Sequence, residues 1–181
     1  MNDAEIARLR DAGDVGHLAE LLKSSDAELR WRVVAALGEI GGADVTPTLI
    51  GALDDPESEV RWRAVVALRD SGDPAVIESV SLKLGDEDDD VRWQAVEALR
   101  RLGTTAVTVH LCRGLEDPNG HIRWTAAKAL GELGDVRAVP ALVEVMKSDG
   151  NHHVQWAAAG ALRSMGIPSA IEEVERFEKS R

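Results

Sequence analysis

The chain has 181 residues, of which only six are aromatic (five Trp, one Phe, no Tyr), although its hydrophobic share of 44% is that of an ordinary globular protein. Its formal net charge of −11 argues against general nucleic-acid binding, because neutralising phosphates requires clustered Lys and Arg. No apolar stretch is long enough to cross a membrane, the N-terminal residues form no apolar signal core, and a single Cys cannot form an internal disulfide. We therefore expect a cytoplasmic protein with an aliphatic core.

The first residues predict a cap. Residues 3–11 are expected to form a solvent-facing helix, and residues 14–23 the second helix of an incomplete unit, so that the N-terminal cap and partial unit span 1–24. At the other end, the charged segment that follows residue 166 predicts a C-terminal cap, with Phe177 packed beneath it.

Between the caps the chain repeats itself. Tryptophan recurs at positions 31, 62, 93, 124 and 156, in the contexts LRWRVVAALGEIG, VRWRAVVALRDSG, VRWQAVEALRRLG, IRWTAAKALGELG and VQWAAAGALRSMG. Self-similarity at a period of about 20 to 50 residues is typical of stacked repeats. We predict one domain over 1–181, with repeats over about 25–54, 55–85, 86–116 and 117–148 and a C-terminal repeat with its cap over 149–181.

Each repeat is expected to contain two helices. In the Trp segment of the second repeat, one helical stripe is formed by Val60, Ala64, Val65, Ala67 and Leu68. Asp55 is predicted to cap this helix, as Asp117 caps a later one, with the following proline at the first helical position. Glycines are predicted to end the Trp helices, at Gly41, Gly72, Gly103, Gly134 and Gly166.

An arginine precedes the Trp in four repeats, as Arg30, Arg61, Arg92 and Arg123. The helical wheel places it at the edge of the core, so we expect it to pair with acids in the turns of neighbouring repeats, such as Asp55, Asp86 and Asp117. Gln155 interrupts the series, and the C-terminal end is therefore expected to fray first.

One copy of the repeat carries a family resemblance, through Ile122, Arg123, Ala126, Ala127, Ala129, Leu130, Gly131, Leu133, Gly134 and Asp135, followed by Ala138 and Val139. This pattern resembles the short HEAT-like repeats of the phycobilin lyases. The resemblance implies an all-α fold, a right-handed α-solenoid of about six HEAT-like helix pairs. It implies function less specifically, because the family includes lyases, hydroxylases and adaptors.

The Trp side chains are predicted to lie away from the core of their own repeats. On the helical wheel they lie at about 200°, whereas the apolar stripe centres near about 50°. The resemblance places this helix on the concave side of the superhelix, and the alternative that the rings only fill grooves between repeats stays open. The predicted partner-binding residues are Trp31, Trp62, Trp93, Trp124, Trp156, Glu28, Glu59, Asp90, Val66, Asp70, Glu97 and Glu132.

Indole faces beside carboxylates attract cations. We therefore predict a non-catalytic scaffold that binds an extended, cation-bearing protein segment on a Trp-lined, mildly acidic concave surface, with self-association left open. The alternative, which follows from the resemblance, is phycobilin-lyase-like binding of a tetrapyrrole or another flat hydrophobic ligand.

No catalytic, metal or cofactor site is predicted. Deoxyhypusine hydroxylases resemble this repeat and hold a di-iron centre with His-Glu pairs, but the matching positions here read Trp followed by Arg, Gln, Thr or Ala. His121, His152 and His153 are a minor metal-site alternative and are expected to be solvated. Cys112, within an apolar segment, is expected to be a small buried thiol.

Overall fold

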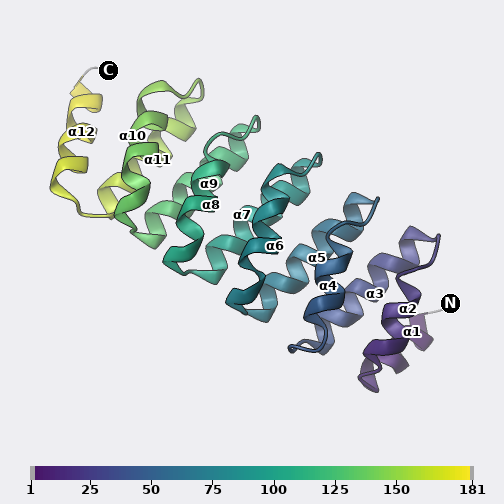
Figure 1. Ribbon diagram of the computed structural model, residues 1–181. Helices are drawn as coiled ribbons and strands as arrows, with labels where there is room; N and C mark the ends of the chain where they lie inside the picture. The colour runs from purple at the N-terminus through teal and green to yellow at the C-terminus, as the bar shows by residue number, and fades with distance from the viewer. Residues whose placement is uncertain (1–2, 180–181) are drawn as a thin grey trace. The chain divides into compact units, whose positions relative to one another are not determined.

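The computed structural model describes residues 3–179, which form helices and no strands (Figure 1). The described chain divides into two compact units, residues 3–102 and 103–179. The first contains α1 (Asp3–Asp11), α2 (Val15–Leu21), α3 (Ala27–Ile40), α4 (Thr46–Ala52), α5 (Ser58–Ser71), η1 (Pro74–Val76), α6 (Ile77–Leu82), η2 (Lys83–Gly85) and α7 (Asp89–Leu102). The second contains η3 (Thr105–Val107), α8 (Thr108–Gly114), α9 (Gly120–Leu133), η4 (Val136–Ala138), α10 (Val139–Ser148), α11 (His152–Ser164) and α12 (Pro168–Lys179).

Within each unit a shorter helix alternates with a longer one that carries the tryptophan. The pairs are α2/α3, α4/α5 and α6/α7 in the first unit and α8/α9 and α10/α11 in the second, with α1 and α12 as single end helices. This arrangement is that of an all-α solenoid, as the sequence predicts. The end helices also occupy the residues predicted for the two caps.

The core is aliphatic. In α5, four members of the predicted stripe, Val60, Ala64, Val65 and Leu68, are completely buried. The fifth, Ala67, is only partly buried, because it faces Gly38 of α3 and lines the hollow between the two helices. Full burial of a Val or Leu side chain contributes about 1.5–3 kcal/mol, so the long helices are held mainly by this stripe. Phe177 of α12 is buried and meets the Trp156 ring edge-on, with 5.8 Å between the ring centroids, which confirms its predicted place beneath the C-terminal cap.

Two glycines allow long helices of the same unit to approach closely. A Cβ atom on Gly131 of α9 would lie 2.7 Å from the Cα atom of Ala161 in α11. A Cβ atom on Gly38 of α3 would lie 2.9 Å from the Cβ atom of Ala67 in α5. Since real Cβ atoms do not make contacts this short, any larger residue would push the helices apart.

The recurrent arginines tie successive turns together. Arg30 donates to both carboxylate oxygens of Asp55, at 2.7 and 2.9 Å, and to the carbonyl oxygen of Ser24 at 2.9 Å. Arg61 binds Asp86 and the Asp55 carbonyl oxygen in the same way. These contacts confirm two of the predicted pairings. In the third, Arg92 belongs to the first unit and Asp117 to the second, and this pairing stays a prediction.

The second unit repeats this pattern. Arg123 donates to Asp149 at 2.7 and 2.9 Å and to the carbonyl oxygen of Asp117 at 2.8 Å. The hydrogen bond from Arg123 is the main reason that the pKa of Asp149 lies below its usual range. Each such arginine therefore fastens the turn before its own helix to the turn of the next repeat.

The predicted helix starts are wrong by about one half-turn. Asp55 is not the N-cap of α5: its carboxylate accepts from the backbone N–H of Glu57 at 2.9 Å, and the helix begins at Ser58. Asp117 accepts likewise from the N–H of Asn119, and Asn119 caps α9. The prolines that follow these acids therefore lie in the turns. The predicted glycine ends are confirmed, with positive φ at Gly41, Gly72, Gly103, Gly134 and Gly166.

Among residues 3–179, no helix has the length and apolar character needed to cross a membrane.

Candidate protein-interaction surface

The tryptophans lie outside the aliphatic core, each on a long helix. Trp31, Trp62 and Trp93 belong to the first unit and are half-buried. In the second unit, Trp124 is half-buried and Trp156 is 50% exposed. The rings thus keep part of their surface in solvent, and polar side chains lie against Trp31, Trp62 and Trp124.

In the first unit, a side chain of the protein itself lies between two of the rings. The guanidinium carbon of Arg63 is 4.2 Å from the centroid of the Trp31 ring and 4.6 Å from that of the Trp62 ring. The Glu59 carboxylate accepts from Arg63 Nε at 2.7 Å and from Trp62 Nε1 at 2.8 Å. An indole pair and a carboxylate therefore hold one guanidinium group between α3 and α5.

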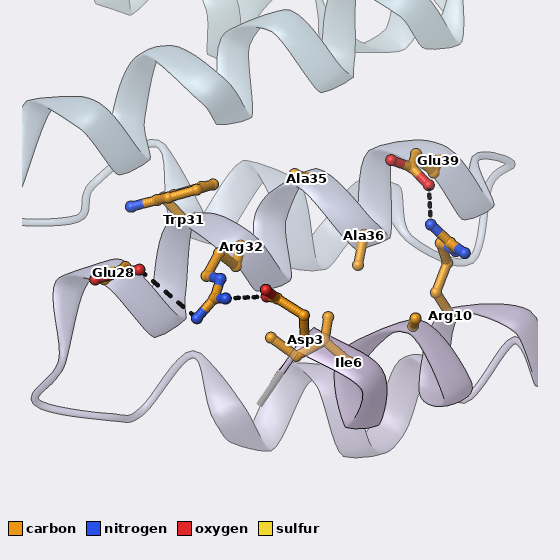
Figure 2. Close-up of a pocket in the computed structure, with 10 residues that line it drawn as sticks. Asp3, Ile6, Arg10, Glu28, Trp31, Arg32, Ala35, Ala36 and Glu39 are labelled. Atoms are coloured by element: carbon orange, nitrogen blue, oxygen red, sulfur yellow. Dashed lines mark hydrogen bonds and ion pairs between the residues drawn. The ribbon is translucent and has the colours of Figure 1, made fainter. Parts of the chain in front are cut away.

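A hollow of about 440 Å³ lies between α1 and α3 (Figure 2). Trp31 and Arg32 of α3 line one side of it, and Asp3, Ile6 and Arg10 of α1 line the other. The Arg32 guanidinium reaches Asp3 and also Glu28, the latter at 3.7 Å, and Arg10 binds Glu39 at 2.5 Å. Ion pairs thus join α1 to α3 across this hollow at two places.

A second hollow, of about 230 Å³, lies between α3 and α5. Trp62, Val66 and Asp70 of α5 line it together with Ala35 and Glu39 of α3, and the last two residues also line the first hollow. The two hollows therefore adjoin along α3. We call them together the N-terminal groove, lined by Asp3, Ile6, Arg10, Glu28, Trp31, Arg32, Ala35, Glu39, Trp62, Arg63, Val66 and Asp70.

Many of the acids that predict an acidic surface are bound to arginines of the chain itself. Besides the pairs above, Asp70 binds Arg69 at 2.9 Å, and Glu97 binds Arg100 at 2.8 Å. Asp90 is exposed in the first turn of α7. The negative charge is nevertheless concentrated here: residues 1–102 contain 22 Asp and Glu against 12 Lys and Arg, a net charge of −10, whereas residues 103–181 contain 10 against 9, a net charge of −1.

The Trp face of the second unit differs in chemistry. His121 stacks on the Trp124 ring, with 5.7 Å between centroids, and the Lys128 amine lies 4.6 Å from the same ring. A hollow of about 450 Å³, lined in part by His121 and His153, adjoins Trp124, as does one of about 360 Å³ lined in part by Lys128 and Glu132. The latter is also lined by Ala157, which holds the repeat position that Arg63 holds in α5.

Metal-ligating and nucleophilic side chains were the remaining candidates for a reactive site. Among residues 3–179, no cluster of three or more His, Cys, Asp or Glu side chains is placed to bind a metal ion. The Cys112 thiol is half-buried, less covered than the sequence predicts. Burial, aided by the nearby charge of Asp135, raises the pKa of Cys112, so the thiol stays protonated at neutral pH.

The structure also identifies residues that sequence reasoning left out of the predicted set. Arg63 is the most important, and the available signal was its position beside Trp62 and four residues after Glu59, a spacing that brings side chains together on a helix. Arg10 and Asp3 shape the groove from α1. Nothing in the repeat signals these two, because α1 lies before the first Trp segment.

Comparison with known proteins agrees with this architecture. The chain is similar to YibA of E. coli over 100% of its own length and 88% of that chain, at 20% identity and a TM-score of 0.69. It matches the CpcE–CpcF complex of the phycocyanin lyase of Nostoc sp. PCC7120 over 87% of this chain and 67% of that one, at 23% identity and a TM-score of 0.67. A designed armadillo repeat protein in complex with the peptide (KR)4 matches over 91% and 87%, at 22% identity and a TM-score of 0.59.

These structural likenesses concern the fold. The comparison with curated proteins finds no match. The family model for HEAT repeats matches residues 15–81, 80–163 and 110–178, so it covers nearly the whole chain. The architecture is that of a helical repeat solenoid. The chain belongs to the family of HEAT-repeat proteins.

Proposed function

We propose that this protein is a non-catalytic cytoplasmic scaffold that binds an extended, cation-bearing segment of another protein along the Trp face of its N-terminal unit. The observation that carries the proposal is the Arg63 guanidinium group, held between Trp31 and Trp62 and fixed by Glu59. Adjacent Trp helices in this unit are thus spaced to accommodate a planar cation, which stacks favourably on indole faces.

Shape and charge support the same partner. The N-terminal groove offers adjoining hollows of about 440 and 230 Å³ in a unit with a net charge of −10. Neighbouring helices pack about 8 to 10 Å apart, and an extended peptide rises about 3.1 to 3.4 Å per residue. The distance from one Trp helix to the next is therefore spanned by about three peptide residues. The designed armadillo protein that binds (KR)4 is an analogue of this mode in a similar fold.

The non-catalytic part of the proposal rests on the composition of the groove. No Ser, Thr, Cys, His or Lys is among the residues that line its two hollows. Its arginines pair with carboxylates within the unit, as Arg10 does with Glu39 and Arg63 with Glu59. Such pairs neutralise each other and hold the helices in place, and they favour recognition over chemistry.

Fluorescence anisotropy with labelled peptides of about twelve residues tests the proposal. One peptide carries arginine at every third position in a Ser/Gly background, and its control carries neutral citrulline there. We expect only the arginine peptide to bind, more weakly as salt rises from about 50 to 500 mM. Trp31→Leu should weaken binding roughly tenfold, and Trp156→Leu in the other unit is the control. Equal binding of the citrulline peptide, or no binding of either, contradicts the proposal.

A second candidate function is binding of a tetrapyrrole or another flat hydrophobic ligand by the C-terminal unit. The hollows of about 450 and 360 Å³ that adjoin Trp124 favour it, since small-molecule pockets fall in this size range. Titration with biliverdin should then quench Trp fluorescence and shift the visible band of the ligand, and Trp124→Leu should remove both signals. Unchanged spectra would rule this candidate out.

A further inference from the structure

The first unit contains a second pair of adjacent tryptophans, Trp62 on α5 and Trp93 on α7. The residue after the Trp is Arg63 on α5, and the equivalent residue on α7, one repeat later, is Gln94. Repeat equivalence therefore places a neutral amide at the position where the preceding pair of helices has a cation.

We call the space between Trp31 and Trp62 the first interval and the space between Trp62 and Trp93 the second interval. The two intervals also differ in whether their polar atoms have hydrogen-bond partners. Arg63 has a counter-ion in Glu59, with the closest nitrogen and oxygen 2.6 Å apart. Gln94 Oε1 is buried and accepts no hydrogen bond from any residue between 3 and 179. Because buried polar atoms in native proteins almost always have partners, an unpaired buried acceptor marks a place where a donor is missing.

An acid is present beside this second interval as well. Asp90 stands three residues before Trp93, as Glu59 does before Trp62, and it is exposed in the first turn of α7. The second interval thus has the two indoles, an acid and an unused acceptor, and the residue that follows its Trp is the uncharged Gln94.

We propose that the interval between Trp62 and Trp93 is the subsite that receives an arginine side chain of the bound segment. The guest guanidinium group stacks on the indoles, donates to Gln94 Oε1 and pairs with Asp90. It enters by displacing the uncharged Gln94 amide, whose terminal torsion is soft enough to turn the oxygen toward the guest. Arg63, fixed by its ion pair, keeps the first interval closed. This inference rests on the proposed function and names its specificity.

Arginine fits this subsite better than lysine. A guanidinium group is planar, stacks on aromatic faces and carries five N–H donors, so it can stack and reach both Gln94 and Asp90 together. The ammonium group of lysine is a compact, strongly hydrated charge that cannot stack in the same manner. A peptide with one arginine should therefore bind several-fold more tightly than its lysine counterpart.

Reciprocal exchange of the two equivalent residues tests the inference. The probe is a fluorescein-labelled Ser/Gly peptide of about twelve residues with one central arginine, compared with lysine and citrulline versions. Gln94→Arg should fill the interval from within and weaken binding of the arginine peptide at least about tenfold, without lowering the melting temperature. Arg63→Gln should open the first interval, so that affinity rises about twofold for one arginine and more for two arginines three residues apart.

Ala157→Arg is the matched control, because it adds the same charge at the same repeat position in the other unit and should leave peptide binding unchanged. If Gln94→Arg does not fold, Gln94→Leu removes the acceptor with little change in size and should erase the preference for arginine over lysine. Unaltered arginine binding in Gln94→Arg, or an unaltered preference in Gln94→Leu, overturns the inference while the proposed function stands. Failure of every arginine peptide to bind the wild-type chain overturns both.

Discussion

The two units contain the same kind of helix pair but differ in what lies between adjacent Trp helices. Between α3 and α5 the space holds Arg63, clamped by Glu59 between two indoles. Between α9 and α11 the equivalent residue is Ala157, which lines a hollow of about 360 Å³ beside Trp124. The residue that follows the Trp therefore decides whether this space is filled or open, while the aliphatic core on the other side of the helices stays the same.

Charge follows the same division. The unit with the filled interval has a net charge of −10, and the unit with the open interval has a net charge of −1. At the position three residues before the Trp, the first unit has Glu28, Glu59 and Asp90, and the second has His121 and His153. The acid at this position is thus replaced by histidine in the second unit, so the two Trp faces suit different partners.

The largest expected effect concerns the arginines that fasten successive turns. Arg61→Ala should lower the free energy of unfolding by about 3 to 5 kcal/mol, because it leaves the buried Asp86 carboxylate without its partner. Arg123→Ala in the second unit should cost less, since the Arg123 side chain is 18% exposed against 7% for Arg61. Urea denaturation followed by circular dichroism measures both.

The double variant Arg61→Ala/Asp86→Ala is the control for that prediction. Removing both charges should recover part of the loss, because no buried charge is then left unpaired. If Arg61→Ala costs no more than Arg123→Ala, the difference in burial does not control the strength of the clamp.

A smaller effect is expected where long helices approach most closely. Gly131→Ala should destabilise the second unit by about 1 to 3 kcal/mol, because its new methyl group would lie 2.7 Å from the backbone of Ala161. Gly38→Ala should cost less in the first unit, since its methyl group would lie 2.9 Å from the Cβ atom and 3.5 Å from the Cα atom of Ala67, farther than the 2.7 Å contacts at Gly131. Thermal unfolding compares the two, and an equal loss in both would show that backbone proximity is not the cause.

How far the sequence predicts this molecule depends on whether a feature repeats. The period, the helix stripes and the glycine helix ends follow from local spacing and from the positive φ that glycine tolerates, as at Gly72. The pairing of Arg30 with Asp55 was also predictable, because it joins equivalent positions of successive repeats. The helix starts were not, because Asp55 is engaged by Arg30 of the preceding repeat and does not cap α5, which local sequence does not reveal.

The candidate site was predictable only in part, for a related reason. The helical wheel placed the Trp side chains away from the core, and the structure agrees for both units. That Arg63 would span from Trp62 to Trp31 depends on the distance between α3 and α5, which the sequence does not contain. The contribution of α1 to the groove is likewise a tertiary contact outside the repeat pattern.

Acid should weaken the clamp of the second unit. The hydrogen bond from Arg123 holds the pKa of Asp149 below its usual range, so this carboxylate contributes stability above about pH 4, and the contribution is lost as the pH falls through its folded-state pKa. The stability difference between wild type and Asp149→Asn should therefore be constant near neutral pH and shrink below about pH 4. Urea titrations at several pH values measure it, with the exposed carboxylate variant Glu144→Gln as control. A difference that does not change with pH would contradict the assignment.

The smallest effect is expected from a variant that fills the open space between α9 and α11, as Arg63 fills the space between α3 and α5. His153→Glu/Ala157→Arg places an acid and an arginine in α11 with the spacing of Glu59 and Arg63 in α5. The new arginine should stack on Trp124 and pair with the new glutamate, raising the free energy of unfolding by about 0.5 to 1 kcal/mol. Its Trp fluorescence should also be less accessible to iodide, because the hollow beside Trp124 is filled. Ala157→Arg alone lacks the acid and should give less than half of this gain. If both variants behave alike, the carboxylate is not what holds a guanidinium group against these rings, and the contrast between the two units rests on side-chain size alone.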